Sequence, residues 1–389
     1  MSEPSQLFRS FWMGGFEGAC HINRSGTRLD LIAATQHDVQ AAADYRLVRA
    51  VGMATVRDGV RWPSVEHGGS YDFSSFIPML QAALAEEVQV IWTLCHYGWP
   101  DDLDVFSAAW VDRFARYCGA VARIVADHTD QVPLYSPINE ISFLCWAAGD
   151  VGGFIHPHAR ERGNELKRQL VRGAAAGIEA IWNVDRRARI VHVDPVIKVF
   201  PRRDRPDLVA EALQYDQSQF EAWDMLSGRT EPQLGGRPEY LDVMGLNFYH
   251  SNQWEHGGDR LRWEDEPRDD RWVPLHQLLA GLYQRYQRPI CLGETSHFGS
   301  GRARWVREIG NEIAAALRAG VPVEGVCLYP VIDRPDWEDA NHWHNSGLFD
   351  LLHQPDGTLR RVLNEEYAGA LCEAQATVTD ALTDALLCD

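Results

Sequence analysis

Apolar runs of strand length alternate with amphipathic helical patterns along most of the chain. Such alternation predicts a parallel sheet, and eight strand units predict an α/β protein with a closed (β/α)8 TIM barrel. The strands are expected over residues 11–18, 53–60, 88–94, 133–140, 190–193, 241–249, 289–294 and 325–331. The helices are expected over residues 35–52, 71–86, 108–128, 167–183, 275–286 and 304–319.

The chain is longer than a plain barrel, which needs about 250 residues, because it has 389. We assign residues 1–370 to one barrel domain and residues 371–389 to a C-terminal tail or helix. The longest predicted loops follow strands one, four, six and eight, so they should all lie on the catalytic face and shape the substrate pocket. They cover residues 19–34, 141–165, 250–274 and 333–347.

Two strand-like stretches share one form. Pro133 to Glu140 and Pro289 to Glu294 each begin at a proline, continue through an apolar run and end in a glutamate. A glutamate after an apolar run is often a helix cap or a solvated loop residue. In a parallel barrel, however, catalytic side chains gather at the C-terminal ends of the strands. Two glutamates facing each other across one pocket would meet the requirement of glycoside hydrolysis, so Glu140 and Glu294 are candidate catalytic carboxyls.

The net charge and the aromatic content indicate which class of binding partner to expect. A net charge of −18 argues against nucleic acid and against an anionic membrane surface, because both would repel the protein. A neutral small molecule fits better. The 14 Trp and 12 Tyr residues include core aromatics, but flat rings also stack on the apolar faces of sugars.

The N-terminal residues and the cysteine pattern indicate which cellular compartment to expect for the protein. Met1 to Arg9 contains no apolar run long enough for a signal peptide, and no later stretch is long enough to cross a bilayer. We therefore expect a soluble cytoplasmic protein. The eight cysteines are scattered and form no Cys-x-x-Cys pair, which favours buried free thiols over disulfides or a zinc site.

Two histidine pairs carry metal-ligating side chains. His156 and His158, and likewise His342 and His344, are separated by one residue in predicted loops. That spacing fits no zinc signature. We predict no metal and no cofactor, and the pairs remain candidates for contact with substrate at the pocket rim.

Seven motifs in chain order resemble those of the family 1 glycoside hydrolases, the β-glucosidase-like members of the barrel superfamily with catalytic glutamates on strands four and seven. They span about residues 11 to 350. The motifs are the 44–52 helix, Arg57-Asp-Gly-Val-Arg-Trp62-Pro63, Thr93-Leu-Cys-His96 with Pro100, Asn139-Glu140, Gly245-Leu-Asn247-Phe-Tyr249, Glu294, and Asp333-Arg-Pro-Asp-Trp337 with Gly347-Leu348.

The resemblance implies roles for these residues. Glu294 would be the nucleophile and Glu140 the acid/base of a retaining mechanism, with their carboxyls about 5 Å apart. Arg57 would stabilise the ionised form of Glu294, and the Tyr249 hydroxyl would orient it. The substrate-binding residues would be His96, Asn139, Asn247, Tyr329, Asp336 and Trp337.

Several positions depart from the family pattern. Gly15 stands where the family has a sugar-binding Gln, Tyr329 replaces a Trp, and Asp336 replaces a longer Glu. Ile141 follows the acid/base in place of Pro, and Thr295-Ser296 follows the nucleophile in place of Asn-Gly. We therefore expect a reshaped sugar pocket, with hydroxyl recognition shifted to loop residues that include Trp254 and the 342–344 segment.

Two functions from different classes remain open. The first is a retaining β-glycosidase that hydrolyses or transglycosylates a small β-glycoside. The second is a non-catalytic sugar-binding barrel that keeps the glycosidase frame, because a fold does not guarantee its usual chemistry. The presence of both glutamates, Arg57 and Tyr249 favours the first.

Overall fold

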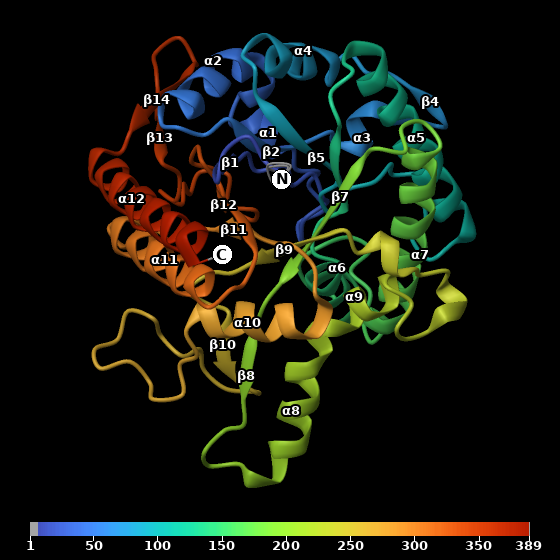
Figure 1. Cartoon of the computed structure of the whole chain (residues 1–389). Coiled ribbons are helices and arrows are strands. Elements are labelled where there is room, and N and C mark those ends of the chain that lie inside the picture. Colours follow the sequence, from blue (N-terminus) through green and yellow to red (C-terminus); the bar gives the residue numbers. More distant parts are fainter. Residues whose placement is uncertain (1–6, 389) are drawn as a thin grey trace.

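Eight parallel strands close into a barrel in the computed structural model (Figure 1), as the sequence predicts. Their order around the barrel follows the chain, and β1 completes the ring by pairing with both β2 and β12. The strands are β1 (Trp12–Gly15), β2 (Thr55–Gly59), β5 (Gln89–Cys95), β6 (Leu134–Ile138), β7 (Arg189–Pro195), β9 (Val243–Asn247), β11 (Ile290–Thr295) and β12 (Val323–Leu328).

The structure describes residues 7–388, and it does not describe the side chains of residues 385–388. The expectation about Met1 to Arg9 therefore falls mostly outside the described residues. Within residues 7–388, no helix combines the length and the apolar character that a membrane crossing requires.

Seven longer helices surround the barrel (Figure 1). The helices α5 and α10 begin and end where the sequence predicts, and α2 ends just before Gly52, whose φ of 85° suits a glycine C-cap. The seven helices are α2 (His37–Ala50), α4 (Ile77–Ala85), α5 (Ala108–His128), α7 (Gly163–Trp182), α10 (Leu275–Tyr286), α11 (Gly301–Arg318) and α12 (Glu365–Cys388).

The helix predicted over residues 71–86 is wrong in its first part. Tyr71 pairs in a small hairpin, β3 (Glu66–His67) with β4 (Ser70–Tyr71), and α4 begins only at Ile77. Pro78 lies in the first turn of α4, where its missing N–H breaks no helical hydrogen bond. The proline therefore marks the true start of the helix.

The connections after the barrel strands contain short elements that the sequence did not predict. The small parallel sheet of β8 and β10, together with α8, forms the protrusion at the bottom of Figure 1. The short helices are α1 (Leu31–Ala34), α3 (Trp62–Val65), α6 (Ile141–Leu144), the π-helix η1 (Cys145–Asp150), α8 (Val209–Gln217) and α9 (Glu221–Leu226), with 3-10 turns η2 (Pro206–Leu208), η3 (Ser218–Phe220), η4 (Pro232–Leu234) and η5 (Pro238–Tyr240). The remaining strands are β8 (Lys198–Phe200), β10 (Gln253–Glu255), β13 (Phe349–His353) and β14 (Leu359–Leu363).

The barrel interior and the layer between strands and helices form two separate apolar clusters. The interior is filled by side chains such as Met13, Ile91, Val191 and Cys327, which close the barrel below the catalytic face. Seven cysteines are free thiols, six of them buried, as expected from their scattered positions. The eighth, Cys388, has no described side chain.

A buried polar network fastens α2 to the barrel and to the C-terminal hairpin. His37 bridges Asp44 and Asp58, with a distance of 2.8 Å to each carboxylate, and the Tyr45 hydroxyl donates to Asp58 at 2.6 Å. Arg361 on β14 donates to both oxygens of Asp44 at 2.7 and 2.8 Å. Burial alone would lower the pKa of His37, but Asp58 and Asp44 outweigh burial and raise it to about 9. The imidazole is therefore a cation at neutral pH.

Candidate active site

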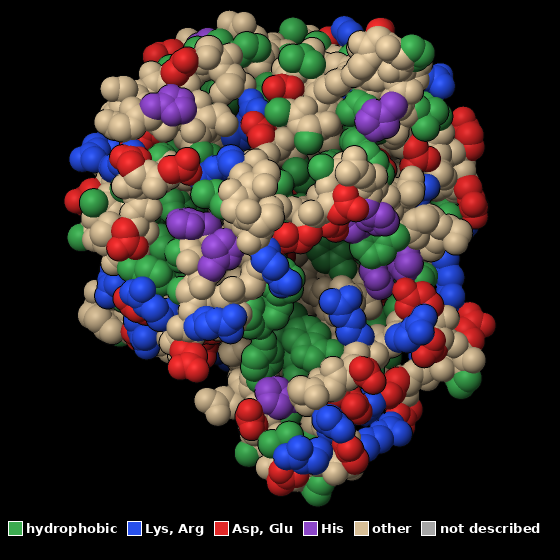
Figure 2. All heavy atoms as spheres, turned by 180° about the vertical axis from the view of Figure 1, so that it is seen from behind, with side chains coloured by type: hydrophobic (Ala, Val, Ile, Leu, Met, Phe, Trp, Pro, Cys, Tyr) green, Lys and Arg blue, Asp and Glu red, His purple; other side chains and the backbone are tan. Residues whose placement is uncertain are grey.

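A cavity of about 1090 Å³ opens at the C-terminal ends of the barrel strands, and both Glu140 and Glu294 line it. Figure 2 shows the molecule hollowed above the protrusion that carries α8. The rest of the lining comes from residues that follow β1, β5 and β12 and from residues of the segments 141–167, 195–221 and 249–260. The two strand-end glutamates thus share one pocket.

Glu294 lies on β11 and is held by two donors. Its carboxylate accepts hydrogen bonds from Arg57 Nη1 at 2.5 Å and from the Tyr249 hydroxyl at 2.8 Å. Arg57 is itself buried, and its Nε donates to the Thr93 hydroxyl at 3.1 Å. A buried guanidinium pairs best with an ionised carboxylate. The arrangement therefore fixes the orientation of the Glu294 carboxyl beside a buried positive charge.

Glu140 directly follows β6 and has a left-handed backbone with φ 45°. Its Oε1 accepts a hydrogen bond from Asn247 at 2.9 Å, and its Oε2 accepts one from the Tyr97 hydroxyl. Burial, and next the negative charge of Glu294, raise the pKa of Glu140 to about 8, against the hydrogen bonds from Tyr97 and Asn247, which lower it. Glu140 therefore carries a proton at neutral pH, as a general acid must.

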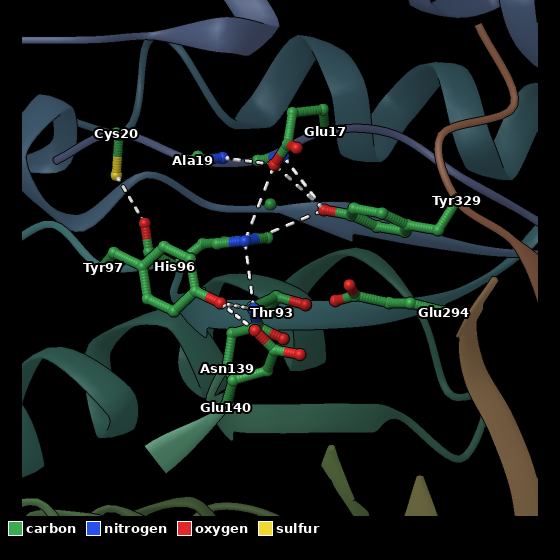
Figure 3. Close-up of polar contacts among 12 residues, drawn as sticks. Glu17, Ala19, Cys20, Thr93, His96, Tyr97, Asn139, Glu140, Glu294 and Tyr329 are labelled. Carbon is green, nitrogen blue, oxygen red and sulfur yellow. Dashed lines mark hydrogen bonds and ion pairs between the residues drawn. The ribbon is translucent and has the colours of Figure 1, made fainter. Parts of the chain in front are cut away.

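Asn139 contacts His96 and Tyr97 on the neighbouring strand end (Figure 3). Its amide oxygen accepts from Arg57, and its amide nitrogen lies 3.0 Å from His96 Nε2 and 2.9 Å from the Tyr97 hydroxyl. Both N–H groups of Asn139 are thus engaged within the protein. The expected hydrogen bond from Asn139 to a sugar hydroxyl would have to replace one of these contacts.

Tyr97 was not among the residues predicted from the sequence. It directly follows His96 and adopts a φ of 66°, a conformation that turns its side chain toward Asn139 and Glu140. Its hydroxyl accepts from the Asn139 amide and donates to Glu140. The only available signal was its position beside the Thr-Leu-Cys-His motif, because nothing in the sequence indicates a left-handed backbone there.

Glu17 is a third buried carboxyl in the cavity and was also missed. Its Oε2 lies 3.2 Å from Arg334 Nε, and its Oε1 lies 3.4 Å from the Tyr329 hydroxyl. Burial is the largest influence on the pKa of Glu17 and raises it, although the nearby Arg334 lowers it. Glu17 lies at the end of the predicted strand over residues 11–18. The argument that strand ends carry functional side chains, which selected Glu140 and Glu294, therefore applies to Glu17 as well.

Tyr329 fills the space that Gly15 leaves on the first strand. A Cβ atom at Gly15 would lie 2.1 Å from Tyr329 Cδ2, closer than real side chains approach. The Tyr329 hydroxyl lies 3.2 Å from His96 Nδ1 and accepts a hydrogen bond from the Gly18 backbone at 3.2 Å. Two departures from the family pattern, Gly15 and Tyr329, are therefore sterically complementary. Tyr329 occupies the position of a strand-one side chain and organises Glu17 and His96 (Figure 3).

We expect the substitutions Gly15→Ala and Tyr329→Ala to be strongly non-additive. Gly15→Ala alone should destabilise the protein by about 1–3 kcal/mol through overpacking, and Tyr329→Ala alone by about 3–5 kcal/mol through a cavity. In the double variant the clash with the Tyr329 ring is gone and only a tight 3.0 Å contact with Cys327 Sγ is left, so the total should fall below the sum by about 1 kcal/mol or more. Chemical denaturation of the four proteins measures this coupling, and simple additivity would contradict the steric account.

Not all predicted substrate-binding residues face the cavity. Trp337 and Trp254 line it, and Trp337 packs beside Tyr97 with ring centroids 5.7 Å apart. Asn139 and Asn247 are fully buried and are not among the lining residues, and neither is Asp336. Its carboxylate instead caps a turn by accepting from the backbone of residues 338 and 339, and it pairs with His344 at 2.9 Å. Asp336 thus shapes the loop after β12 that carries Trp337.

The cavity extends well beyond the glutamates. Its far part is lined by the α6–α7 segment, by α8 and by residues 254–260, with Ser142, Lys167, Tyr215 and Trp254 among the lining residues. Lys167 is held by Glu221 at 2.5 Å. This part of the cavity is mixed aromatic and polar, which suits a hydroxylated ligand.

Comparison with known proteins identifies the fold. No family model matches the sequence, and no curated protein sequence matches it. Among solved structures, a β-glucosidase from Thermotoga maritima in complex with glucoimidazole superposes with a TM-score of 0.73 at 13% identity, over 96% of this chain and 99% of that one. A rice β-glucosidase mutant in a covalent complex with glucose gives 0.73 at 14% identity, over 95% and 98%. The chain therefore has the fold of the family 1 β-glucosidases, over nearly its whole length.

Proposed function

We propose that the protein is a retaining β-glycosidase, with Glu294 as nucleophile and Glu140 as acid/base. The observation that carries the proposal is the contrast between two carboxyls in one cavity. Glu294 is paired with Arg57 and Tyr249, whereas the pKa of Glu140 is raised to about 8 by burial and by the charge of Glu294. Retaining glycosidases require one ionised and one protonated carboxyl of this kind. The fold shared with β-glucosidases supports the same assignment.

The proposed reaction proceeds in two displacements. A Glu294 oxygen attacks the anomeric carbon while Glu140 gives its proton to the departing glycosidic oxygen, which breaks the C–O bond and forms a glycosyl-enzyme ester. Glu140, now ionised, then removes a proton from water or from an acceptor hydroxyl, whose oxygen attacks the anomeric carbon and releases Glu294. Arg57 and Tyr249 hold Glu294 in place for both steps.

The glycone would lie between the glutamates and the wall formed by His96, Tyr329 and Trp337. Burial lowers the pKa of His96 well below its ordinary value, so the ring is neutral. Asn247 and Asn139 are buried behind the cavity wall, where they hold Glu140 and Tyr97, and Asp336 contributes through the loop that it stabilises. The aglycone of a small β-glycoside would occupy the far part of the cavity, beside Trp254.

A panel of nitrophenyl glycosides that differ in sugar and ring form tests the proposed function. We expect at least one β-glycoside to be cleaved with net retention, which proton NMR of the first-formed anomer reads directly. A Glu294→Gln variant that is inactive on the same compound excludes a contaminating hydrolase. Saturable binding of the panel without turnover by the wild type would instead favour the non-catalytic sugar-binding barrel.

Tyr97→Phe should move the alkaline limb of the pH profile of kcat/KM to higher pH. The Tyr97 hydroxyl donates to the Glu140 carboxylate and thereby stabilises its ionised form. Without this bond the pKa of Glu140 should rise by about one unit, because a hydrogen bond to a charged group contributes about 1.5–3 kcal/mol at most. Tyr117→Phe, which removes a buried hydroxyl bonded to the Leu94 backbone, is the matched control. An unshifted or acid-shifted limb in Tyr97→Phe would refute the assigned contact.

A further inference from the structure

Three metal-ligating side chains converge beside the nucleophile strand. His250 follows Tyr249 after β9, His297 follows Glu294 by three residues after β11, and Glu264 belongs to the loop after β10. One ligand atom from each of the three lies within 4.8 Å of the others. The cluster matches no sequence motif, because its members come from three separate segments.

A simple hydrogen-bond network accounts for only two of these residues. His297 Nε2 lies 3.0 Å from Glu264 Oε1, which is an ordinary hydrogen bond. His250 Nε2 lies 4.0 Å from the same oxygen, which is too long for one. The other nitrogen of His250, Nδ1, is buried and has no hydrogen-bond partner among residues 7–388. The ring of His250 packs against His297, with centroids 4.1 Å apart, and against Phe298, with centroids 5.3 Å apart. This packing holds His250 beside the His297–Glu264 pair.

We propose that His250, His297 and Glu264 form a binding site for one divalent transition-metal ion, of which Zn²⁺ is the best match. Two imidazoles and one carboxylate are a common donor set for zinc. Ligand atoms about 2.0–2.2 Å from a tetrahedral ion lie roughly 3.3–3.5 Å from one another. The separations from Glu264 Oε1 are 3.0 and 4.0 Å, and all three ligand atoms lie within 4.8 Å of one another, so the side chains would have to move closer together around an ion.

The backbone contacts of His297 determine which of its ring nitrogens carries the proton. His297 Nδ1 lies 2.7 Å from the Phe298 backbone nitrogen and 3.1 Å from the Phe298 carbonyl oxygen. The Phe298 N–H donates to Nδ1, so the ring proton lies on Nε2 and is donated to Glu264. An ion that binds Nε2 would have to displace this proton.

The surroundings would exclude bulk water from the ion on one side. Trp263 and Trp305 pack around the histidines, with ring centroids 5.2 Å from His297 for Trp263 and 6.1 Å from His250 for Trp305. His250 also lines the large cavity. An ion here would tie together the segments that follow β9 and β11, and these strands carry Tyr249 and Glu294 at their ends. We assign the ion a structural role in holding the nucleophile segment.

Metal titration tests the site without any substrate, so its outcome is independent of the proposed glycosidase activity. Protein made without a histidine tag and stripped with a chelator would be titrated with Zn²⁺ by calorimetry and with Co²⁺ by visible absorption. We expect one ion per chain in the wild type, and at least about a hundredfold weaker binding in His250→Ala, His297→Ala and Glu264→Gln. The Co²⁺ spectrum should show the intense bands of a low-coordinate site.

The matched control is His276→Ala, which breaks a histidine–glutamate pair outside the cluster, with His276 Nδ1 2.8 Å from Glu312. It should bind Zn²⁺ like the wild type. Zn²⁺ should also raise the unfolding temperature of the wild type and of His276→Ala, but not that of the three cluster variants. Circular dichroism in chelator establishes that each variant is folded. Equal Zn²⁺ affinity in the wild type and the cluster variants, or no saturable binding near one equivalent, would overturn the proposal.

Discussion

Glu294→Gly should lower kcat by about four orders of magnitude or more, because the variant has no carboxylate to form the glycosyl-enzyme. Arg57 and Tyr249 would then face an empty space large enough for a small anion. Added azide should enter that space, attack the anomeric carbon directly and restore turnover with an activated aryl glycoside. Because only one displacement occurs, the glycosyl azide should have inverted configuration.

The measurement is the anomeric coupling constant of the glycosyl azide, alongside the rate with and without azide. Glu312→Gly, at a surface position on α11 paired with His276, shows the effect of the same substitution away from the cavity. Retained configuration in the Glu294→Gly product would be inconsistent with a nucleophile at this position. Undiminished activity would remove Glu294 from the mechanism altogether.

Glu140→Ala should affect substrates according to their leaving groups. Glycosides with poor leaving groups need protonation at the departing oxygen and should lose about 10²–10⁴-fold in kcat/KM, whereas activated aryl glycosides should lose far less in the first step. Azide should accelerate breakdown of the glycosyl-enzyme from the face that the leaving group vacated, and so give a product of retained configuration. The alkaline limb of the pH profile should disappear, because it reports loss of the Glu140 proton.

The two variants thus make opposite stereochemical predictions with one reagent. The reverse pairing of azide products would exchange the roles of Glu140 and Glu294. Rescue of neither variant, with folded proteins and a wild-type substrate in hand, would argue against a covalent glycosyl-enzyme.

The hydrophobic pattern located two strand-end glutamates that the structure places in one cavity, because strand ends are readable from such a pattern. Glu140 and Glu294 follow long apolar runs, and the barrel geometry then brings their side chains to one face. Backbone conformations such as the positive φ of Tyr97 leave no such trace. The motif order also could not show which way a side chain points, so Asp336 could not be distinguished from a residue that faces the cavity.

Short elements were missed for a related reason. The strands β8 and β10 have three residues each and exist because they pair with one another across a long separation in sequence. Neither run is long enough to show a period of its own. Tyr71 was assigned to a helix because its surroundings are apolar at helical spacing, whereas a turn at residues 68 and 69, both glycines with positive φ, commits it to a hairpin.

The buried network around His37 limits when helix α2 can complete its packing during synthesis of the chain. Asp44 leaves the ribosome 317 residues before Arg361, the guanidinium that balances it. Until Arg361 is available, the carboxylates of Asp44 and Asp58 share the single positive charge of His37. Burying a carboxylate without a partner charge costs free energy, so it opposes packing of α2. Helix α2 can therefore adopt its final packing only after the hairpin of β13 and β14 has been translated. A nascent chain with this arrangement must stay soluble through most of its translation. Its native packing can be completed only at the very end.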